Sequence, residues 1–266
     1  MDDAPIRLSG WALVLGASSG FGEAIAGALA GAGVDVFGVH LDRKPTLPNA
    51  QRVARGIEAL GRRARFFNIN AADAERRAEV VADMARLAEP GSLRVLVHSL
   101  AFGALRPLIV DDPQEAATPA QIDMTLDVMA HTLVYWTQAV VRAALMGKGG
   151  RVFAMTSSGS ARALPHYGPV SAAKAALESH VRQLAMELAP RGITVNAIRA
   201  GLTATPAAQK IPGYERLADS ARRRNPSGRM TTPQDVARAV VVLCHADTHW
   251  ITGNVIGVDG GEEIVG

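Results

Sequence analysis

The stretch LGASSGFGEA, from Leu15 to Ala24, decides the fold. It places Gly16, Gly20 and Gly22 between an apolar run, WALVL, and a segment whose apolar residues recur at helical spacing. A glycine turn of this kind lets the backbone approach a pyrophosphate closely, and the N–H groups at the helix start bind its anionic oxygens. We therefore predict a dinucleotide-binding loop built from Gly16, Ser18, Ser19, Gly20, Phe21 and Gly22.

The remainder of the chain continues this alternation of strand and helix. Short apolar strands are predicted at 34–41, 64–71, 93–101, 150–157, 193–200 and 254–260. Amphipathic helices are predicted between them, including 50–61, 74–87 and a long one over about 120–146. This order predicts an α/β fold, a single-domain Rossmann-like doubly wound parallel sheet over residues 1–266.

Two long loops interrupt the compact rhythm, at 102–121 and at about 202–230. Long loops in compact domains are commonly functional. Both follow the carboxyl ends of predicted strands, where open α/β sheets bind ligands. We expect the second to be the substrate loop.

Composition excludes several other classes of protein. The chain has 48% apolar and 20% charged residues and a net charge of +3, which is ordinary for a globular protein and too small to indicate nucleic-acid binding. One cysteine allows no internal disulfide, and the seven histidines show no paired metal-ligand spacing. No apolar run spans a membrane, and the acidic N-terminus is unlike a signal peptide. We expect a cytoplasmic protein that binds no metal, nucleic acid or membrane.

Two further segments carry a resemblance to a known family. ITVNAIRAG (193–201) and ITGNVIGVDGG (251–261), together with the glycine loop, resemble the short-chain dehydrogenase/reductase superfamily from about Leu8 to the end of the chain. The resemblance implies that Asn68 lies near the adenine and that Thr203 and Thr205 lie near the nicotinamide amide or the phosphates. His98 is a further candidate for a cofactor contact, or else a satisfied strand-end histidine.

The end of the second predicted strand reads VHLDRK and bears on the choice of cofactor. Leu41 takes the position most like the acid that holds the ribose hydroxyl in NAD enzymes, and leucine cannot do this. Arg43 and Lys44 can neutralise a 2′-phosphate. We therefore predict NADPH; the alternative is NADH, with Asp42 as the acid after a small shift.

The candidate catalytic residues are Ser157, Tyr167 and Lys174. Members of the family commonly carry the tyrosine four residues before the lysine, where this chain has Val170. Seven residues separate Tyr167 from Lys174, close to two helical turns, so the two can share a face. Pro169 predicts that Tyr167 stands at or just before a helix start. In the family the lysine and the cofactor ribose lower the phenol's pKa.

The displaced tyrosine favours one reaction over another. Reduction of an enoyl thioester at its β-carbon puts the oxygen that needs a donor roughly 2 to 3 Å farther out than ketone reduction does. The Tyr-x6-Lys spacing, VHSLAFG (97–103), and Met129 in place of a common asparagine all resemble the enoyl-acyl-carrier-protein reductases of the superfamily. The resemblance implies an NADPH-dependent enoyl-thioester reductase for acyl-carrier-protein or CoA substrates, with Tyr167 stabilising the enolate.

Other interpretations remain open on the sequence. The protein can be a carbonyl or alcohol oxidoreductase of the same fold that acts on 3-ketoacyl thioesters or other ketones. It can also be a non-catalytic cofactor-binding protein. Tyr167 can also be a packing residue, with Ser157 or water supplying the proton. The resemblance further implies a homotetramer, because members of the family pair their fourth and fifth helices.

Overall fold

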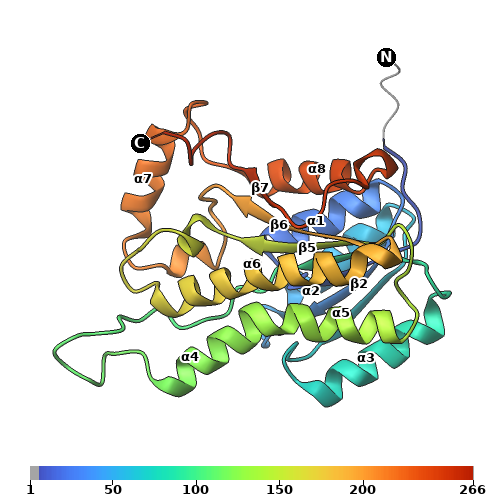
Figure 1. Ribbon diagram of the computed structural model, residues 1–266, viewed down its shortest axis with the longest axis horizontal. Helices are drawn as coiled ribbons and strands as arrows, with labels where there is room; N and C mark the ends of the chain where they lie inside the picture. The colour runs from blue at the N-terminus through green and yellow to red at the C-terminus, as the bar shows by residue number, and fades with distance from the viewer. Residues whose placement is uncertain (1–5, 266) are drawn as a thin grey trace.

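Seven parallel strands form one sheet at the centre of the computed structural model, which describes residues 6–265 (Figure 1). The strand order is β3-β2-β1-β4-β5-β6-β7. The chain starts in the middle of the sheet and builds outward in both directions, so the order reverses between β1 and β4. The strands are β1 (Trp11–Leu15), β2 (Asp35–His40), β3 (Ala64–Asn68), β4 (Leu93–His98), β5 (Arg151–Thr156), β6 (Thr194–Ala200) and β7 (Val255–Val258).

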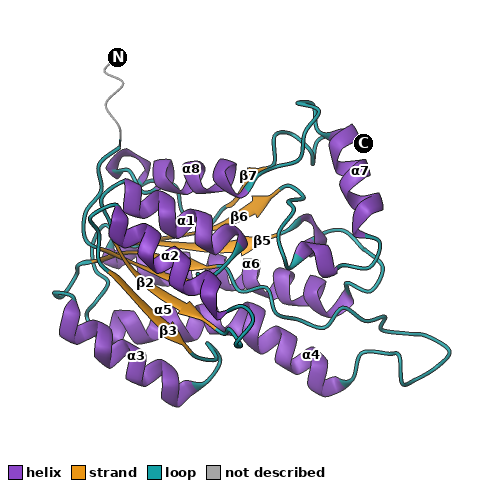
Figure 2. Ribbon diagram, turned by 180° about the vertical axis from the view of Figure 1, so that it is seen from behind, coloured by secondary structure: helices purple, strands orange, loops and turns teal. Residues whose placement is uncertain are grey.

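Helices cover both faces of the sheet (Figures 1 and 2). One layer consists of α1 (Gly20–Gly31), α2 (Leu47–Ala59) and α8 (Pro233–Leu243), which share a buried apolar cluster with one face of the strands. The other layer contains α3 (Ala74–Leu87), α5 (Thr132–Arg142) and α6 (Gly168–Leu188), which share a second cluster with the opposite face. The fold predicted from the sequence is therefore confirmed.

The long helix predicted over 120–146 is three pieces. It runs as α4 (Pro119–Leu126), a π-helical turn η1 (Asp127–His131) and α5. Thr118 begins α4 with a capping box, in which its hydroxyl accepts from the Gln121 N–H and the Gln121 side chain accepts from the Thr118 N–H. A π-turn inserts one extra residue, which apolar periodicity does not reveal, and such turns are frequent at functional sites.

The loop over 202–230 contains a helix that the sequence analysis did not predict. This helix, α7 (Tyr214–Arg224), follows a short 3₁₀ turn, η4 (Ala208–Lys210), and buries Ala218 and Ala221. Figure 1 shows α7 standing apart from the sheet, beside the C-terminus. Between residues 6 and 265, no helix is both long and apolar enough for a bilayer crossing.

Candidate functional site

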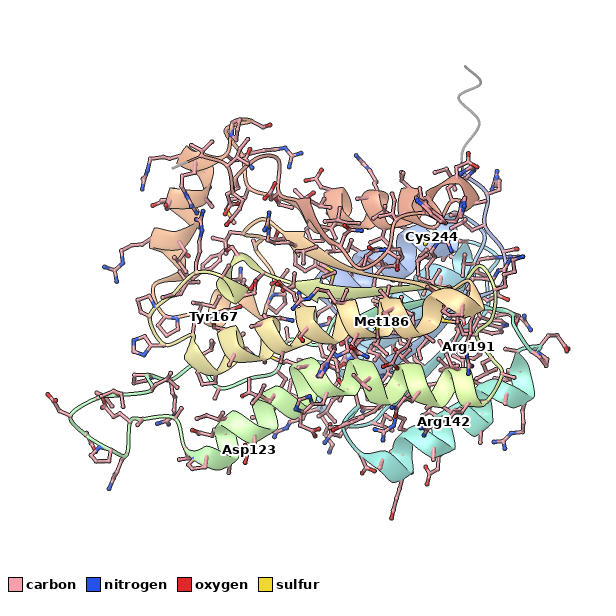
Figure 3. All side chains as sticks on the ribbon, in the orientation of Figure 1. Asp123, Arg142, Tyr167, Met186, Arg191 and Cys244 are labelled. Carbon is pink, nitrogen blue, oxygen red and sulfur yellow. The ribbon has the colours of Figure 1, made fainter. Side chains whose placement is uncertain are left out.

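A cavity of about 350 Å³ opens at the carboxyl ends of the strands. Its walls come from the glycine loop, the segments after β4, β5 and β6, the start of α6, and α7. Figure 3 shows Tyr167 at the end of α6 that lies below α7. Of the predicted residues, the cavity brings together Phe21, Ser157, Tyr167, Lys174, Thr203 and Thr205.

The glycine loop is built for close backbone approach. Gly16 has a φ of +87°, and a Cβ there would lie 2.5 Å from the Ser99 carbonyl oxygen. A Cβ on Gly22 would lie 2.0 Å from the Gly16 carbonyl oxygen. Neither position admits a side chain. The N–H groups of Gly16 and Ala17 donate to the Val39 carbonyl oxygen, whereas those from Ser18 to Gly22, at the start of α1, have no backbone acceptor among the described residues. This cradle fits the pyrophosphate of a dinucleotide.

Tyr167 presents its hydroxyl group to the cavity from the residue just before α6. Its side chain is buried, and its hydroxyl oxygen lies 3.3 Å from that of Ser157. Gly159 makes room for the ring, because a Cβ on Gly159 would lie 2.4 Å from Cε1 of the tyrosine. His166, immediately before the tyrosine, has a φ of +60°, a left-handed conformation uncommon for a non-glycine residue. Backbone strain of this kind concentrates at functional sites.

The tyrosine and the lysine have shifted pKa values with different causes. Burial raises the pKa of Tyr167, opposed by the hydrogen bond with Ser157, so the phenol stays protonated at neutral pH. Burial also lowers the pKa of Lys174 to about 8, opposed by the charge of Glu178. The Lys174 ammonium donates to the Met155 carbonyl oxygen at 2.7 Å. The expected lowering of the phenol's pKa by this lysine is therefore not seen.

Two apolar side chains occupy the positions at which the family commonly has a tyrosine and an asparagine. Val170, at the usual tyrosine position, and Met129, at the usual asparagine position, are both buried and line the cavity. They close over Gly103, where a Cβ would lie 2.8 Å from the Met129 sulfur and 3.0 Å from a Val170 methyl group. Neither side chain donates a hydrogen bond, so this wall is apolar.

His98 lies behind the cavity rather than in its lining. Its ring is fully buried, and Nε2 is 2.8 Å from the Thr132 hydroxyl oxygen. Because that hydroxyl donates to the Val128 carbonyl oxygen, Nε2 carries the proton, and the buried Nδ1 has no partner among the described residues. Burial, followed by the charge of Lys174, lowers the pKa of His98 to about 3. The structure favours a neutral strand-end histidine over the predicted cofactor contact.

The residues predicted to hold the adenosine half meet at the ends of β2 and β3. The Asn68 side-chain amide donates to the Asp42 carbonyl oxygen and accepts from the Asp42 N–H, each at 2.9 Å. The Asp42 carboxylate is 2.9 Å from His40 Nδ1, and its side chain is only 9% exposed. Arg43 and Lys44 are exposed and have no ion-pair partner among the described residues.

The Asp42 carboxylate is charged at neutral pH. Burial tends to raise its pKa, but hydrogen bonds from Thr46, from Ser18 of the glycine loop and from the neighbouring histidine outweigh burial and hold the pKa below its usual value. A charged carboxylate beside the glycine loop repels a 2′-phosphate and attracts a ribose hydroxyl group.

Glu262 is a site residue that the sequence analysis missed. It is buried at the cavity wall, where Oε2 accepts from the Leu202 N–H at 3.0 Å and Oε1 lies 3.6 Å from Arg224 Nη2. Burial raises its pKa, opposed by the Leu202 N–H and the Arg224 charge. The carboxylate thus connects the C-terminal turn to Leu202, which precedes α7, and to Arg224, the last residue of α7. Its signal was a pair of glutamates, Glu262 and Glu263, directly after the VDGG motif.

Thr203 and Thr205 are both buried in the wall of the cavity. The Thr203 hydroxyl donates to the Gly201 carbonyl oxygen at 3.0 Å, and Thr205 packs against Gly20. Within residues 6–265, no cluster of three or more His, Cys, Asp or Glu has the arrangement of a metal site.

Comparison with known proteins agrees with this geometry. A family model described as enoyl-(acyl carrier protein) reductase matches residues 16–263. The chain belongs to the short-chain dehydrogenase/reductase superfamily, in the family that this model describes. The superfamily consists of nicotinamide-dependent oxidoreductases, and the chain is one of them.

Three similar proteins illustrate the range within the superfamily. The enoyl-[acyl-carrier-protein] reductase (NADH) of Aquifex aeolicus is 34% identical over 66% of this chain and 64% of its own length, so the match spans less than two thirds of that relative. The 1-cyclohexenylcarbonyl-CoA reductase of Streptomyces collinus is 33% identical over 95% of this chain and 86% of its own. A short-chain dehydrogenase structure from Burkholderia cenocepacia in complex with NADP has a TM-score of 0.82 and 32% identity, covering 98% and 100% of the two chains.

Proposed function

We propose that this protein reduces the 2,3 double bond of an enoyl thioester carried by an acyl-carrier protein or CoA, with NADPH as the reductant. The observation that carries the proposal is the placement of hydrogen-bond donors. Tyr167 and Ser157 form one polar spot in the cavity, and the position of a ketone reductase's tyrosine is taken by Val170. Similar proteins named as enoyl-thioester reductases support the substrate class.

The chemistry divides between the cofactor and the residues of the chain. When bound, the reduced nicotinamide would supply a hydride to the β-carbon of the substrate, and a proton from solvent would add to the α-carbon of the resulting enolate to complete the reduction. Tyr167, protonated because burial raises its pKa, donates a hydrogen bond to the thioester oxygen as negative charge develops there. Ser157 holds the phenol from 3.3 Å. The apolar wall of Val170 and Met129 excludes water from the acyl group.

Other residues of the chain would hold the cofactor. The N–H groups of the loop from Ser18 to Gly22, which have no backbone acceptor among the described residues, suit the pyrophosphate. Lys174, buried and charged below a pH of about 8, is the cation for the nicotinamide ribose. Thr203 and Thr205 line the nicotinamide end of the cavity.

The preference for NADPH rests on Arg43 and Lys44. Both are exposed without an ion-pair partner among the described residues, whereas the Asp42 side chain is turned inward onto His40 and is 9% exposed. Guanidinium and ammonium groups bind a 2′-phosphate through charge-assisted hydrogen bonds. One observation favours NADH, namely the hydrogen bond of Asp42 with Ser18 of the glycine loop.

A matched pair of substrates tests the function. Crotonyl-CoA and acetoacetyl-CoA carry the same four-carbon chain, and NADPH consumption is followed with each. In the ketone the charge develops on the oxygen of the β-carbon, where the wall offers Val170 and Met129 and no donor. One lost donor of this kind costs about 3 to 4 kcal/mol, so we expect a preference for the enoyl substrate of about 10² or more in kcat/KM.

The results separate the alternatives. Faster turnover of acetoacetyl-CoA than of crotonyl-CoA identifies the protein as a carbonyl reductase. Tight NADPH binding without turnover of enoyl or keto thioesters identifies a cofactor-binding protein instead. Repeating the assay with the crotonyl group on an acyl-carrier protein identifies the carrier that the enzyme prefers.

We also propose a homotetramer. Exposed apolar side chains on α6 and α8 support this, with Met186 at 64% and Val242 at 51% exposure. Light scattering at micromolar concentration tests it, and a monomer mass overturns it.

A further inference from the structure

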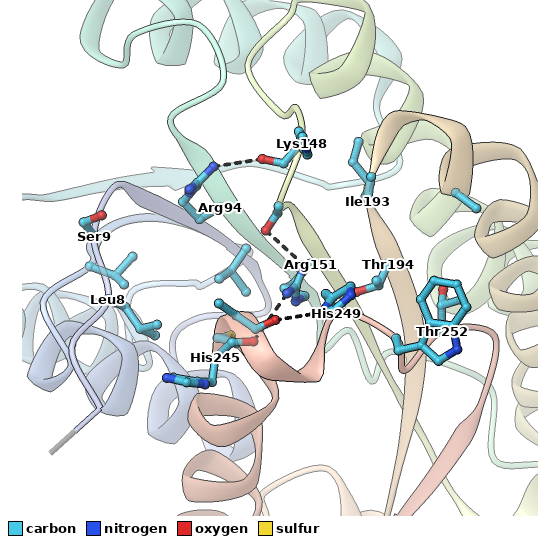
Figure 4. Close-up of a pocket in the computed structure, with 18 of the residues that line it drawn as sticks. Leu8, Ser9, Arg94, Lys148, Arg151, Ile193, Thr194, His245, His249 and Thr252 are labelled. Atoms are coloured by element: carbon cyan, nitrogen blue, oxygen red, sulfur yellow. Dashed lines mark hydrogen bonds between the residues drawn. The ribbon is translucent and has the colours of Figure 1, made fainter. Parts of the chain in front are cut away.

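A second and larger cavity, of about 790 Å³, lies at the amino end of the sheet (Figure 4). It shares no lining residue with the candidate active site. Strand β5 connects the two regions, since Arg151 at its first residue lines this cavity and Ser157 follows its last. At about 3.3 Å per residue, the two cavities are roughly 20 Å apart.

The charged side chains that line this cavity are all basic, and the one other titratable group in the lining, the Cys244 thiol, stays neutral because burial raises its pKa to about 12. Arg94 stands on β4, Lys148 and Arg151 stand before and at the start of β5, and Arg7 precedes β1. His245 and His249 follow α8. No aspartate or glutamate occurs among the lining residues that the structure describes. A cavity with several cations of one sign concentrates a positive potential that attracts anions.

Arg151 is the least satisfied of these cations. It is only 4% exposed, and its Nη atoms donate to the carbonyl oxygens of Gly149, Gly150 and His245 at 3.2, 3.3 and 3.4 Å, all at the long end for hydrogen bonds. Its Nε has no partner, and no acid of residues 6–265 forms an ion pair with it. A buried charge without a counter-charge is costly.

A second buried polar group lies beside it. Thr194, which also lines the cavity, is 7% exposed, and its hydroxyl group has no partner among the described residues. Arg94, by contrast, uses Nη1 to donate to the Lys148 carbonyl oxygen at 3.0 Å and keeps its other donors unassigned. Three cations on two neighbouring strands and their connecting loop therefore converge without a partner of opposite charge.

The rest of the lining is apolar. Leu8, Val34, Val95 and Ile193 contribute aliphatic surface, and Trp250 adds an exposed indole ring. Ligand cavities of about 300 to 1,000 Å³ typically combine an apolar surface with a few convergent polar groups. The combination here suits a small molecule with one anionic group and an apolar body.

We propose that this cavity binds a small organic anion, with its carboxylate or phosphate group between Arg94, Lys148 and Arg151 and its apolar part against Ile193 and Trp250. The competing interpretation is structural: Arg94 and Arg151 only stabilise the loops whose carbonyl groups accept their hydrogen bonds. The proposal does not depend on the function of the active site.

Trp250 provides a readout at this cavity. It is 88% exposed, whereas Trp11 and Trp136 are 4% and 0% exposed, so a ligand here changes mainly the Trp250 fluorescence. The full-length protein is first saturated with NADP⁺, which fills the dinucleotide site. It is then titrated with octanoate and, separately, with inorganic phosphate. Calorimetry on Trp250→Phe, which removes the fluorescent group, checks that binding itself persists.

The variant Arg94→Ala/Lys148→Ala tests the site, because both side chains are exposed and their loss leaves the core intact. Arg55→Ala/Arg142→Ala removes two exposed cations elsewhere and is the matched control. We expect saturable binding of octanoate to the wild type, weakened at least 10-fold in the first variant and unchanged in the control. Phosphate binding with the same dependence shows that the anionic group alone is recognised. No saturable binding, or binding that the first variant leaves unchanged, overturns the proposal.

Discussion

Replacement of Tyr167 by phenylalanine is the most direct test of how the site works. The change removes one hydroxyl group and leaves the ring, which packs against Gly159, in place. Loss of a single aimed donor in an oxyanion site costs about 2.7 to 4 kcal/mol, or 10²- to 10³-fold in kcat. The tyrosine is 8% exposed, so water has little access to replace the hydroxyl group. We therefore expect the kcat for crotonyl-CoA to fall by at least about 10².

Neighbouring variants show whether the donor's position matters as well as its presence. The 3.3 Å contact between Ser157 and the phenol is long, so Ser157→Ala should cost only about 1 kcal/mol, roughly 5-fold. Since Ser157 acts through the phenol, the double variant should be no slower than Tyr167→Phe alone. Gly159→Ala keeps the hydroxyl group but places a methyl group 2.4 Å from the ring, and should approach the loss of Tyr167→Phe.

The assay follows the absorbance of the reduced nicotinamide at saturating crotonyl-CoA, and fluorescence titration measures NADPH affinity separately. Tyr167→Phe should leave NADPH affinity unchanged. Lys174→Ala should reduce both affinity and turnover, because the lysine is the proposed cation for the ribose. Turnover of Tyr167→Phe within 3-fold of the wild type would refute the reasoning and make the tyrosine a packing residue.

Two further predictions concern the cavity wall and the cofactor. Glu262→Gln keeps an acceptor for the Leu202 N–H but loses the charge facing Arg224, so we expect KM for the thioester to rise several-fold with kcat little changed. Because the pKa of Glu262 is raised, its charge is lost as pH falls through that pKa. The KM of the wild type should rise over this pH range, whereas the KM of Glu262→Gln should not. The melting temperature of Glu262→Gln at neutral pH should be no lower than that of the wild type, because burial of the charge destabilises the fold. Arg43→Ala/Lys44→Ala should lower kcat/KM for NADPH by about 10-fold or more and leave that for NADH unchanged. A wild-type preference of 10-fold or more for NADH would instead assign the ribose to Asp42, and Asp42→Asn should then reduce NADH use.

Much of the fold was predictable because local patterns and the global arrangement agree. The apolar runs were too long and continuous for strands with one face in solvent, and β5 and most of β4 and β6 are indeed buried on both sides. The helix predicted over 74–87 is α3, with the same bounds. Asp73 at its N-cap accepts from the N–H groups of Glu75 and Arg76, which is a local signal that tertiary packing did not override.

The unpredicted elements depend on contacts between distant parts of the chain. Helix α7 is strongly charged, and only Ala218 and Ala221 among its residues are buried, so its apolar face carries only small side chains and gave little signal of a buried helix. Its position depends on Glu262, from a turn more than 30 residues later, which no local pattern reveals. The interior orientation of His98 was equally hidden, because a strand-end histidine has the same sequence signature whether it faces a ligand or a helix.

The catalytic spacing shows where sequence geometry is too coarse. A shared helical face was one expected link between Tyr167 and Lys174. The tyrosine is the residue before α6, as Pro169 predicted, and it follows the left-handed backbone of His166, which helical periodicity does not reveal. What aims the hydroxyl group is the left-handed backbone before the tyrosine, the absence of a side chain at Gly159, and the Ser157 hydroxyl group. These three features lie within ten residues of Tyr167, yet each acts through space rather than through spacing.

The absence of a hydrogen-bond donor on the Val170 and Met129 side of the cavity indicates the reaction as much as the Tyr167 hydroxyl group does. A ketone reductase stabilises charge next to the carbon that accepts hydride, whereas this cavity presents Val170 and Met129 from two different helical elements. Both pack against Gly103, where even a methyl group would not fit, so position 103 admits no polar side chain that could replace the missing donor. The hydroxyl groups of Tyr167 and Ser157 are therefore the donors available to stabilise the transition state. They stabilise it most for a substrate whose negative charge develops on an oxygen that is not bonded to the reduced carbon, and an enoyl thioester is such a substrate.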